Sequence, residues 1–277
     1  MLIRSAIFFR TCYKPLKKTY DIFCRLTSCF RSSPDFVIVG AQKAGTTSLL
    51  DLILQHPDIK RPRAKEVHFF DENFEKGVTW YHSFFPLNFL GKLTGEASPY
   101  YLFHPGVPKR LYDYKKNIKI IAILRDPVGR AVSHYHHAVR KGFEDLKISE
   151  ALGCEDERLA GDLEKIKKGD FSLSWRYKEQ SYTRRGLYAE QLERYFDLFP
   201  RNQICLLKSE DLFSDPQQEI EKIFEFLGVD SRFVLEDIAA KNVGSYLCED
   251  ENTNDYLEKR FAESNQKLAN EYGINFG

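Results

Sequence analysis

One short segment carries residue types that bind phosphate. An apolar run ends at Gly40, and the chain continues as Ala41-Gln42-Lys43-Ala44-Gly45-Thr46-Thr47-Ser48. Glycines let backbone N–H groups turn inward, and a helix that follows adds unpaired N–H donors and a positive dipole end. The segment therefore predicts an anion cradle, made of Lys43, Ala44, Gly45, Thr46, Thr47 and Ser48. In the Walker A pattern the lysine follows the second glycine, whereas here it lies between the glycines. The alternative is an ordinary glycine-containing turn.

A second segment pairs an arginine with a serine. Arg125 follows the most apolar run of the chain, Pro127 begins a helix, and Ser133 lies about two turns into that helix. A guanidinium at the end of a strand can grip a phosphate with two parallel hydrogen bonds. Two phosphate sites on separate strands would suit a nucleotide phosphorylated at both ends of its ribose. The alternative is that Arg125 pairs with a carboxylate such as Asp126.

Residues 65–71, Lys-Glu-Val-His-Phe-Phe-Asp, hold a candidate general base. A carboxylate such as Glu66 can remove a proton from an acceptor, and Glu96 is the next candidate. If residues 65–70 form a strand, Glu66 and His68 share a face. The alternatives are an ion pair between Glu66 and Lys65 and a buried structural role for His68. Three further histidines (134, 136 and 137) lack metal-ligand spacing and indicate a solvated or interface helix face.

The elements that must position these residues alternate between strands and helices. Runs at 35–40, 65–70, 93–98, 117–124 and 203–208 predict strands, and runs at 46–54, 105–114, 187–199 and 217–227 predict helices. Residues 144–185 are polar and predict mixed helix and loop, with a lid as one role. The alternation predicts an α/β fold with three layers and a central, mostly parallel sheet. In such sheets ligands bind at the carboxyl ends of strands.

Composition limits the classes of protein. The 277 residues hold 41 basic and 40 acidic side chains, so no net charge favours nucleic acid as a partner. Residues 1–33 are different, since seven basic side chains and one acid give them a charge of +6. We expect residues 1–34 to form a leader outside the core, either a solvated arm or a membrane-surface segment, and residues 35–277 to form one domain. No run is apolar for long enough to span a bilayer.

The six cysteines are scattered and show no metal-binding spacing. We interpret them as free thiols, which predicts a cytoplasmic location with peripheral membrane contact through the basic segment as an option. An even count also permits disulfides. The oligomeric state is not predicted.

Together these motifs resemble the sulfotransferases that use 3′-phosphoadenosine 5′-phosphosulfate (PAPS) as donor. The Lys43 loop resembles their P-loop-like phosphosulfate-binding turn, and Arg125 with Ser133 resembles their 3′-phosphate site. Residues 65–71, 95–101 and 185–188 resemble the heparan sulfate branch of that family. The similarity runs from about residue 35 to residue 228.

The resemblance implies a role for each residue. Lys43 would contact the bridging and sulfuryl oxygens, and the next five residues would bind the 5′-phosphate. Glu66 would be the general base, with His68 beside it, and Tyr188 would lie near the nucleotide. Residues 241–246 resemble a loop that closes over the cofactor. The acceptor would be a hydroxyl or amine of a saccharide or small molecule, and no metal is implied.

Ala97 departs from the heparan pattern, which often has lysine there, so one cation near the sulfuryl group is missing or is supplied from elsewhere. Two other functions stay open. One is a Walker-A-like kinase using ATP and Mg²⁺, with Asp126 as the obvious metal-binding acid. The other is a non-catalytic module that binds glycan or nucleotide. Pure binding requires no general base, so the presence of a candidate base argues against this alternative.

Overall fold

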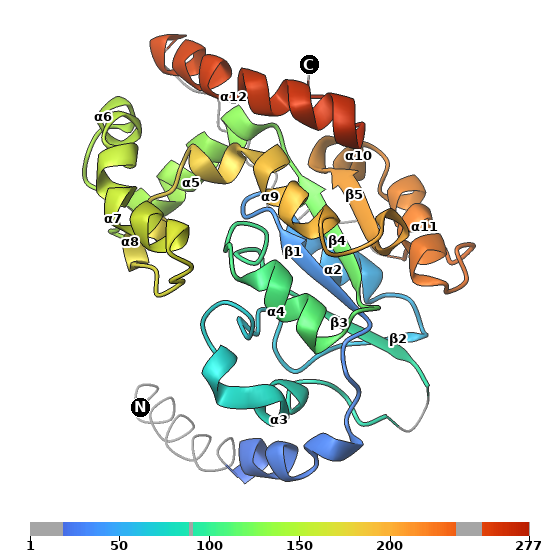
Figure 1. The fold of residues 1–277 in the computed structure, drawn as a ribbon. Coiled ribbons are helices and arrows are strands. Elements are labelled where there is room, and N and C mark those ends of the chain that lie inside the picture. Colours follow the sequence, from blue (N-terminus) through green and yellow to red (C-terminus); the bar gives the residue numbers. More distant parts are fainter. Residues whose placement is uncertain (1–18, 89–90, 237–250, 277) are drawn as a thin grey trace, which may run out of the picture.

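The computed structural model describes residues 19–88, 91–236 and 251–276. At its centre lies a sheet whose strand order is β2-β3-β1-β4-β5, with every neighbouring pair parallel. This arrangement confirms the predicted α/β fold (Figure 1). The strands are β1 (Phe36–Gly40), β2 (Ile59–Lys60), β3 (Leu93–Ala97), β4 (Lys119–Leu124) and β5 (Ile204–Lys208).

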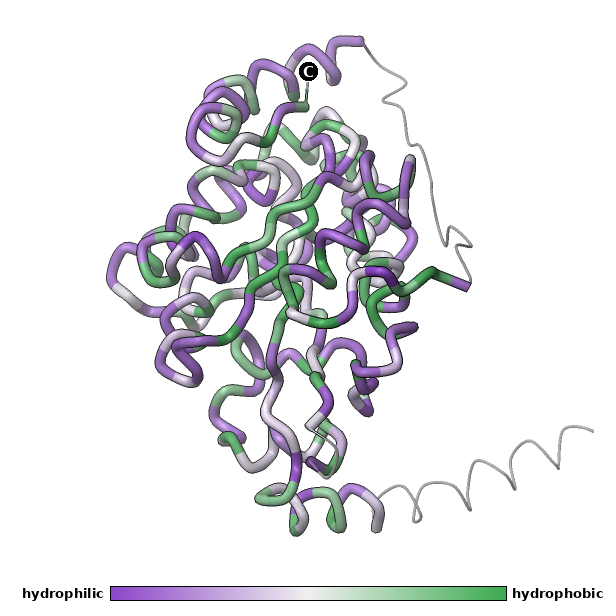
Figure 2. The backbone as a smooth tube through the Cα atoms, turned by 90° about the vertical axis from the view of Figure 1, so that its right-hand side faces the viewer, coloured by the Kyte–Doolittle hydropathy of each residue, from purple (hydrophilic) through white to green (hydrophobic). Residues whose placement is uncertain are grey.

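Helices cover both faces of the sheet. In Figure 1, α4 (Val107–Tyr114) and α9 (Tyr188–Phe196) lie in front of the strands, and α2 (Thr46–Ile53) lies behind them. Helix α11 (Pro216–Leu227) packs against α2 and β5. All five residues of β1 are buried, which explains why this strand is apolar without alternation. Figure 2 shows the same pattern, with hydrophobic segments gathered in the strands at the centre.

The strand order places two predicted phosphate sites together. The chain passes from β1 to strands on one side of it and then crosses to β4 on its other side. Ligands bind at such a switch point because the loops leaving the two strands diverge there. The loop after β1 holds Lys43, and the loop after β4 holds Arg125. The sheet topology therefore brings the two loops to one edge.

The remaining helices surround this core. Helix α12 packs against α5 and α9, although no helix was predicted there. Its buried residues recur every three or four positions, a signal that was present in the sequence. These helices are α3 (Gly77–His82), α5 (Pro127–Arg140), α6 (Ile148–Gly153), α7 (Glu155–Lys167), α8 (Trp175–Glu179), α10 (Ser209–Ser214) and α12 (Glu251–Tyr272), with 3-10 turns η1 (Ser28–Phe30), η2 (Phe74–Lys76), η3 (Arg184–Gly186) and η4 (Arg201–Gln203).

The predicted strand at residues 65–70 is wrong, because this segment is an irregular loop. Side chains from the end of β3 and the turn after it bind the backbone N–H groups that a strand would pair. The N–H of Val67 donates to Glu96 Oε2 and that of His68 to Ser98 Oγ. The next two N–H groups donate to the hydroxyl of Tyr101. Side-chain acceptors thus replace a neighbouring strand.

Part of the predicted leader is docked on the domain. Residues 19–26 are helical, and Cys24 in this helix is fully buried. Arg31 donates to the carbonyl oxygen of Phe85 at 2.7 Å. Residues 19–34 therefore contact the domain, while residues 1–18 lie outside the described residues.

Within the described ranges, no helix combines the length and apolarity that crossing a membrane requires. Four cysteines in those ranges are free thiols: Cys24, Cys29, Cys154 and Cys205. The cytoplasmic location stays a prediction.

Candidate active site

The loop between β1 and α2 has the geometry of an anion cradle. Gly45 has a φ of +96°, and a Cβ at this position would lie 2.9 Å from the ring of Phe213, so only glycine fits. Lys43 also has a positive φ, of 73°. Helix α2 begins at Thr46 without a side-chain cap, which leaves the N–H groups of its first turn for a ligand.

Lys43 lies in a strongly positive environment. Burial lowers the pKa of its ammonium, and the charges of Arg140, Arg125, Lys141 and Arg130 lower it further. All four of these side chains are cations, as Lys43 is. An anion that binds among them relieves the repulsion between their positive charges. The electrostatics of the loop thus support the predicted anion site.

The hydroxyl residues of the loop differ in exposure. Thr46 and Ser48 are buried at the start of α2, and Ala44 is fully buried beneath the loop. Thr47 is exposed, and its Oγ1 accepts a hydrogen bond from Lys65 Nζ. Since Lys65 also lies 3.2 Å from Glu66 Oε1, one ammonium links the cradle to the candidate base.

The second predicted phosphate site adjoins the first. Arg125 Nη1 donates to the carbonyl oxygen of Lys43 at 3.3 Å. The hydroxyl of Tyr188 donates to the carbonyl oxygen of Arg125 at 2.9 Å, which ties α9 to the end of β4. Ser133 lies on α5 and is buried. The carboxylate of Asp126 caps α5 by accepting from the N–H of Gly129.

Arg185 is a site residue that the sequence reasoning missed. Its Nη1 donates to Gln42 Oε1 in the Lys43 loop, although the two residues are 143 positions apart. The guanidinium is almost completely buried and lies 4.7 Å from the ring centroid of Tyr100. Burial lowers its pKa to about 10, so it stays charged at neutral pH. The motif at 185–188 was noted, but only the fold shows what this arginine contacts.

Glu66 and His68 lie together, as predicted, although the reason differs. His68 Nε2 is 3.3 Å from Glu66 Oε2, and His68 Nδ1 is 2.7 Å from the buried carboxylate of Asp71. A positive φ of 51° at His68, not strand alternation, turns its ring toward Glu66. The hydrogen bond from His68 lowers the pKa of Glu66, with Lys65 adding to the effect against a smaller opposing effect of burial. Glu66 is therefore an ionised carboxylate held by two cations.

Glu96 is an anchor for the loop that carries Glu66. It is fully buried at the end of β3 and accepts hydrogen bonds from Val67 N–H and from the hydroxyls of Tyr81, Ser98 and Tyr101. Burial raises the pKa of Glu96. With its oxygens occupied and no solvent access, it is poorly placed to remove a proton from an acceptor. Its neighbour Ala97 is also buried and supplies no charge, and the cations in contact with Glu66 are Lys65 and His68.

We expect His68 to stay protonated at neutral pH. Burial alone would lower its pKa, but hydrogen bonds to Asp71 and Glu66 raise the pKa to about 10. The ion pairs of protonated His68 therefore stabilise the folded protein fully below about pH 6.5, the pKa of an unfolded histidine. This stabilisation is lost as the pH rises through the higher pKa of His68 in the folded protein. Nuclear magnetic resonance of the histidine rings should show no titration of His68 between pH 6 and 8.

Asp71→Asn should move the titration of His68 toward its ordinary range. His104 provides an internal reference, because burial lowers its pKa to about 4. A wild-type His68 that titrates near pH 6.5 would contradict the ion-pair arrangement.

The histidine-rich face of α5 is not simply solvated, because His134 is fully buried. Burial and the charges of Arg185 and Arg130 lower its pKa well below the usual value, so the ring is neutral. His136 and His137 are half-buried on the same helix. No cluster of three or more potential metal ligands occurs within the described ranges. Residues 241–246, the predicted cofactor-closing loop, lie outside those ranges.

Comparisons with known proteins agree with this geometry. The profile of the Sulfotransferase domain family matches residues 33–268. Human heparan sulfate glucosamine 3-O-sulfotransferase 3B1 is 34% identical over 196 residues, which are 71% of this chain and 46% of that protein. Human heparan sulfate glucosamine 3-O-sulfotransferase 5 is 30% identical over 226 residues, or 81% and 62% of the two chains. The chain spans about half the length of the first of these curated relatives.

A solved structure is similar over nearly its whole length. The sulfotransferase from Alicyclobacillus acidocaldarius has a TM-score of 0.72 at 33% identity, covering 88% of this chain and 98% of the other. The chain belongs to the sulfotransferase domain family, which confirms the resemblance seen in its motifs.

Proposed function

We propose that this protein transfers a sulfuryl group from PAPS to a hydroxyl or amine of an acceptor, with a saccharide as the acceptor class. The observation that carries the proposal is the pair of contacts made by Lys65. Its ammonium contacts Thr47 in the anion cradle and Glu66 beside it. A donor held in the cradle and an acceptor held at Glu66 would thus be neighbours, as in-line transfer requires.

The residues divide the chemistry between them. As the bond from sulfur to the acceptor oxygen forms, the bond from sulfur to the phosphate oxygen breaks, and negative charge grows on the leaving phosphate. Lys43 and the N–H groups of the loop stabilise that charge. Glu66 accepts the proton that the acceptor loses. Protonated His68, itself held by Asp71, orients Glu66.

The nucleotide should be distinguished by its 3′-phosphate. Arg125 and Ser133 lie at the end of β4 and on α5, next to the loop that would hold the 5′-phosphate. We expect 3′,5′-adenosine bisphosphate to bind far more tightly than 5′-AMP, and Arg125→Ala to remove most of the difference. Calorimetry measures both affinities. Equal affinities of the wild-type protein for the two nucleotides would contradict the two-phosphate site.

The relatives support a saccharide acceptor, because they are named as heparan sulfate glucosamine sulfotransferases. The direct experiment is transfer of radiolabelled sulfate from PAPS to a panel of glycans and small alcohols. Labelled glycan supports the proposal. Bisphosphate binding without labelling of any acceptor would favour a non-catalytic module, and Mg²⁺-dependent use of ATP would favour a kinase.

A further inference from the structure

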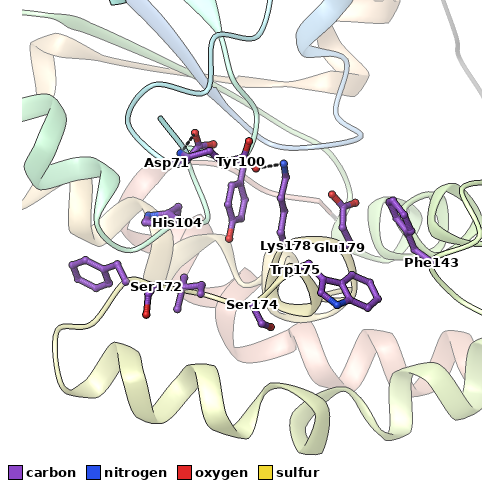
Figure 3. Close-up of a pocket in the computed structure, with 12 residues that line it drawn as sticks. Asp71, Tyr100, His104, Phe143, Ser172, Ser174, Trp175, Lys178 and Glu179 are labelled. Atoms are coloured by element: carbon purple, nitrogen blue, oxygen red, sulfur yellow. Dashed lines mark hydrogen bonds and ion pairs between the residues drawn. The ribbon is translucent and has the colours of Figure 1, made fainter. Parts of the chain in front are cut away.

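A cavity of about 590 Å³ opens at Asp71, which contacts the candidate base Glu66 through His68. It begins at Asp71, whose carboxylate holds His68, and is closed on the other side by α8 and the segment before it (Figure 3). Its volume lies in the range typical of sites for small organic ligands. His68 connects the lining carboxylate of Asp71 to Glu66, and no residue of the anion cradle lines the cavity.

The cavity has aromatic walls. Its lining includes the rings of Tyr100, His104, Phe143, Phe171 and Trp175. The indole of Trp175 is 54% exposed, and its ring centroid lies 6.0 Å from that of Phe143. Figure 3 shows these two rings at one end of the cavity, away from His104. Flat aromatic surfaces of this kind pack against the C–H face of a sugar ring.

The charged groups of the lining do not suit a polyanion. The lining holds three carboxylates (Asp71, Glu72 and Glu179) and one ammonium, that of Lys178, and Asp71 is already paired with protonated His68. Lys178 already pairs with Glu72. His104 adds no positive charge at neutral pH, because burial lowers its pKa to about 4. A chain of sulfated or carboxylated sugars would therefore meet Glu179, the one lining carboxylate for which no ion pair is seen among the described residues.

We propose that this cavity is the acceptor subsite and that it selects an uncharged sugar ring, stacked on Trp175, over a polyanionic glycan. The inference rests on the proposed function and makes it more specific. It assigns Trp175 to acceptor packing and Glu179 to the exclusion of anionic acceptors.

The first test is Trp175→Ala, assayed with an uncharged oligosaccharide such as chitotriose. We expect KM for the glycan to rise at least tenfold, with the affinity for 3′,5′-adenosine bisphosphate unchanged. Tyr256→Ala is the matched control, because this tyrosine is 45% exposed on α12 and lies outside the cavity lining. An unchanged KM in the Trp175 variant would overturn the subsite.

The second test compares chitotriose with an N-sulfated heparosan oligosaccharide. The wild-type protein should have the higher kcat/KM for the uncharged glycan, and Glu179→Lys should shift the ratio toward the anionic one. A wild-type preference for the anionic glycan would overturn this inference and leave the proposed function intact. Failure to label either glycan or any other acceptor, with bisphosphate still bound, would instead contradict the proposed function.

An independent observation concerns residues 19–30. The helix at 19–26 is held on the domain by its inner side, through buried Cys24 and an ion pair between Asp21 and Arg63. Its outer side carries Ile22, Phe23 and Leu26, which are 51%, 52% and 76% exposed. At about 100° per residue these three fall within one arc of about 100°. Phe30 in the following turn is 64% exposed.

The occupant of this face can be inferred from charge. Residues 1–18 contain five basic side chains and no acid, and Arg25 follows within the helix. Exposed apolar side chains next to basic ones bind the interface of bilayers that contain anionic lipid. In Figure 1 the helix lies at the end of the molecule opposite α12. We infer that the apolar face of residues 22–30 rests on an anionic membrane surface.

Co-sedimentation of the full chain with vesicles tests this surface. We expect binding to vesicles of phosphatidylcholine with 30% phosphatidylserine, weakened by salt and abolished by the double variant Phe23→Ser with Leu26→Ser. Val234→Ser is the control, since this valine is 70% exposed elsewhere on the surface. Wild-type protein that stays in the supernatant would overturn the inference. A dimer that the double variant disrupts, without vesicle binding, would assign the face to a second copy of the chain instead.

Discussion

Replacing Lys43 with alanine is expected to lower the rate of sulfuryl transfer by roughly 10²–10³, the usual effect of losing one group that stabilises transition-state charge. The reason is its place in the loop between β1 and α2, where four other cations surround it. Those cations would still attract the nucleotide in the variant. We therefore expect a smaller change in the affinity for 3′,5′-adenosine bisphosphate, measured by calorimetry, than in kcat, measured with radiolabelled donor.

Lys109→Ala is a suitable control for loss of a lysine charge, because Lys109 lies on the exposed side of α4 and its side chain is 66% exposed. The melting temperature of both variants should stay close to that of the wild-type protein. Near-normal kcat for Lys43→Ala would refute the assignment of this loop to the leaving phosphate.

Glu66→Gln is expected to lower kcat by roughly 10²–10⁴, the range for loss of a general base. The amide keeps the shape of the side chain but cannot take up a proton. Nucleotide affinity should stay level or improve, because a negative charge near the bound phosphates is removed. Glu66→Asp should restore little activity, since the shorter side chain moves the oxygen away from the acceptor.

A structural role for Glu66 makes a different prediction. The Glu66 side chain, which forms ion pairs with Lys65 and His68, is 38% exposed. Partly exposed pairs contribute little to stability. If Glu66 only steadies its loop, Glu66→Gln would show a slightly lower melting temperature with nearly intact kcat. Steady-state kinetics measured beside melting curves separates the two roles.

The activity should also depend on pH through these groups. The pKa of Glu66 is below its ordinary value and that of His68 is raised to about 10. The base is therefore ionised, and its partner charged, throughout the neutral range. We expect kcat to be level from about pH 6 to pH 9, as far as these two residues control it, and to change as His68 loses its proton at higher pH.

Much of the candidate site could be predicted because its parts are local in sequence. The phosphate loop is one unbroken segment between a buried strand and a helix, so its glycines, lysine and hydroxyls are visible together. The same holds for Arg125 and Ser133, which follow the buried strand β4. Parallel strands place such loops at one edge of the sheet, and the contact between Arg125 and the carbonyl oxygen of Lys43 is the result.

The loop at 65–70 shows where local pattern fails. Its apolar and aromatic residues favour a strand, but its backbone N–H groups are bound by side chains that lie about 30 positions further along. Glu96 is the clearest case, because a carboxylate in sequence gives no sign that it will be buried under four donors. Its chemistry would suit a general base, but its burial in the fold makes it an anchor.

The sequence by itself determined the layers of the fold, and it predicted the two phosphate sites and the candidate base. Runs of apolar residues must be buried. Glycines and charged residues that directly follow such a run indicate a ligand-binding turn. Only the tertiary structure decided that Arg185 reaches Gln42, that His134 is buried, and that aromatic rings from distant segments enclose one cavity. These contacts join residues far apart in the chain, and their partners are selected by packing, which no local pattern encodes.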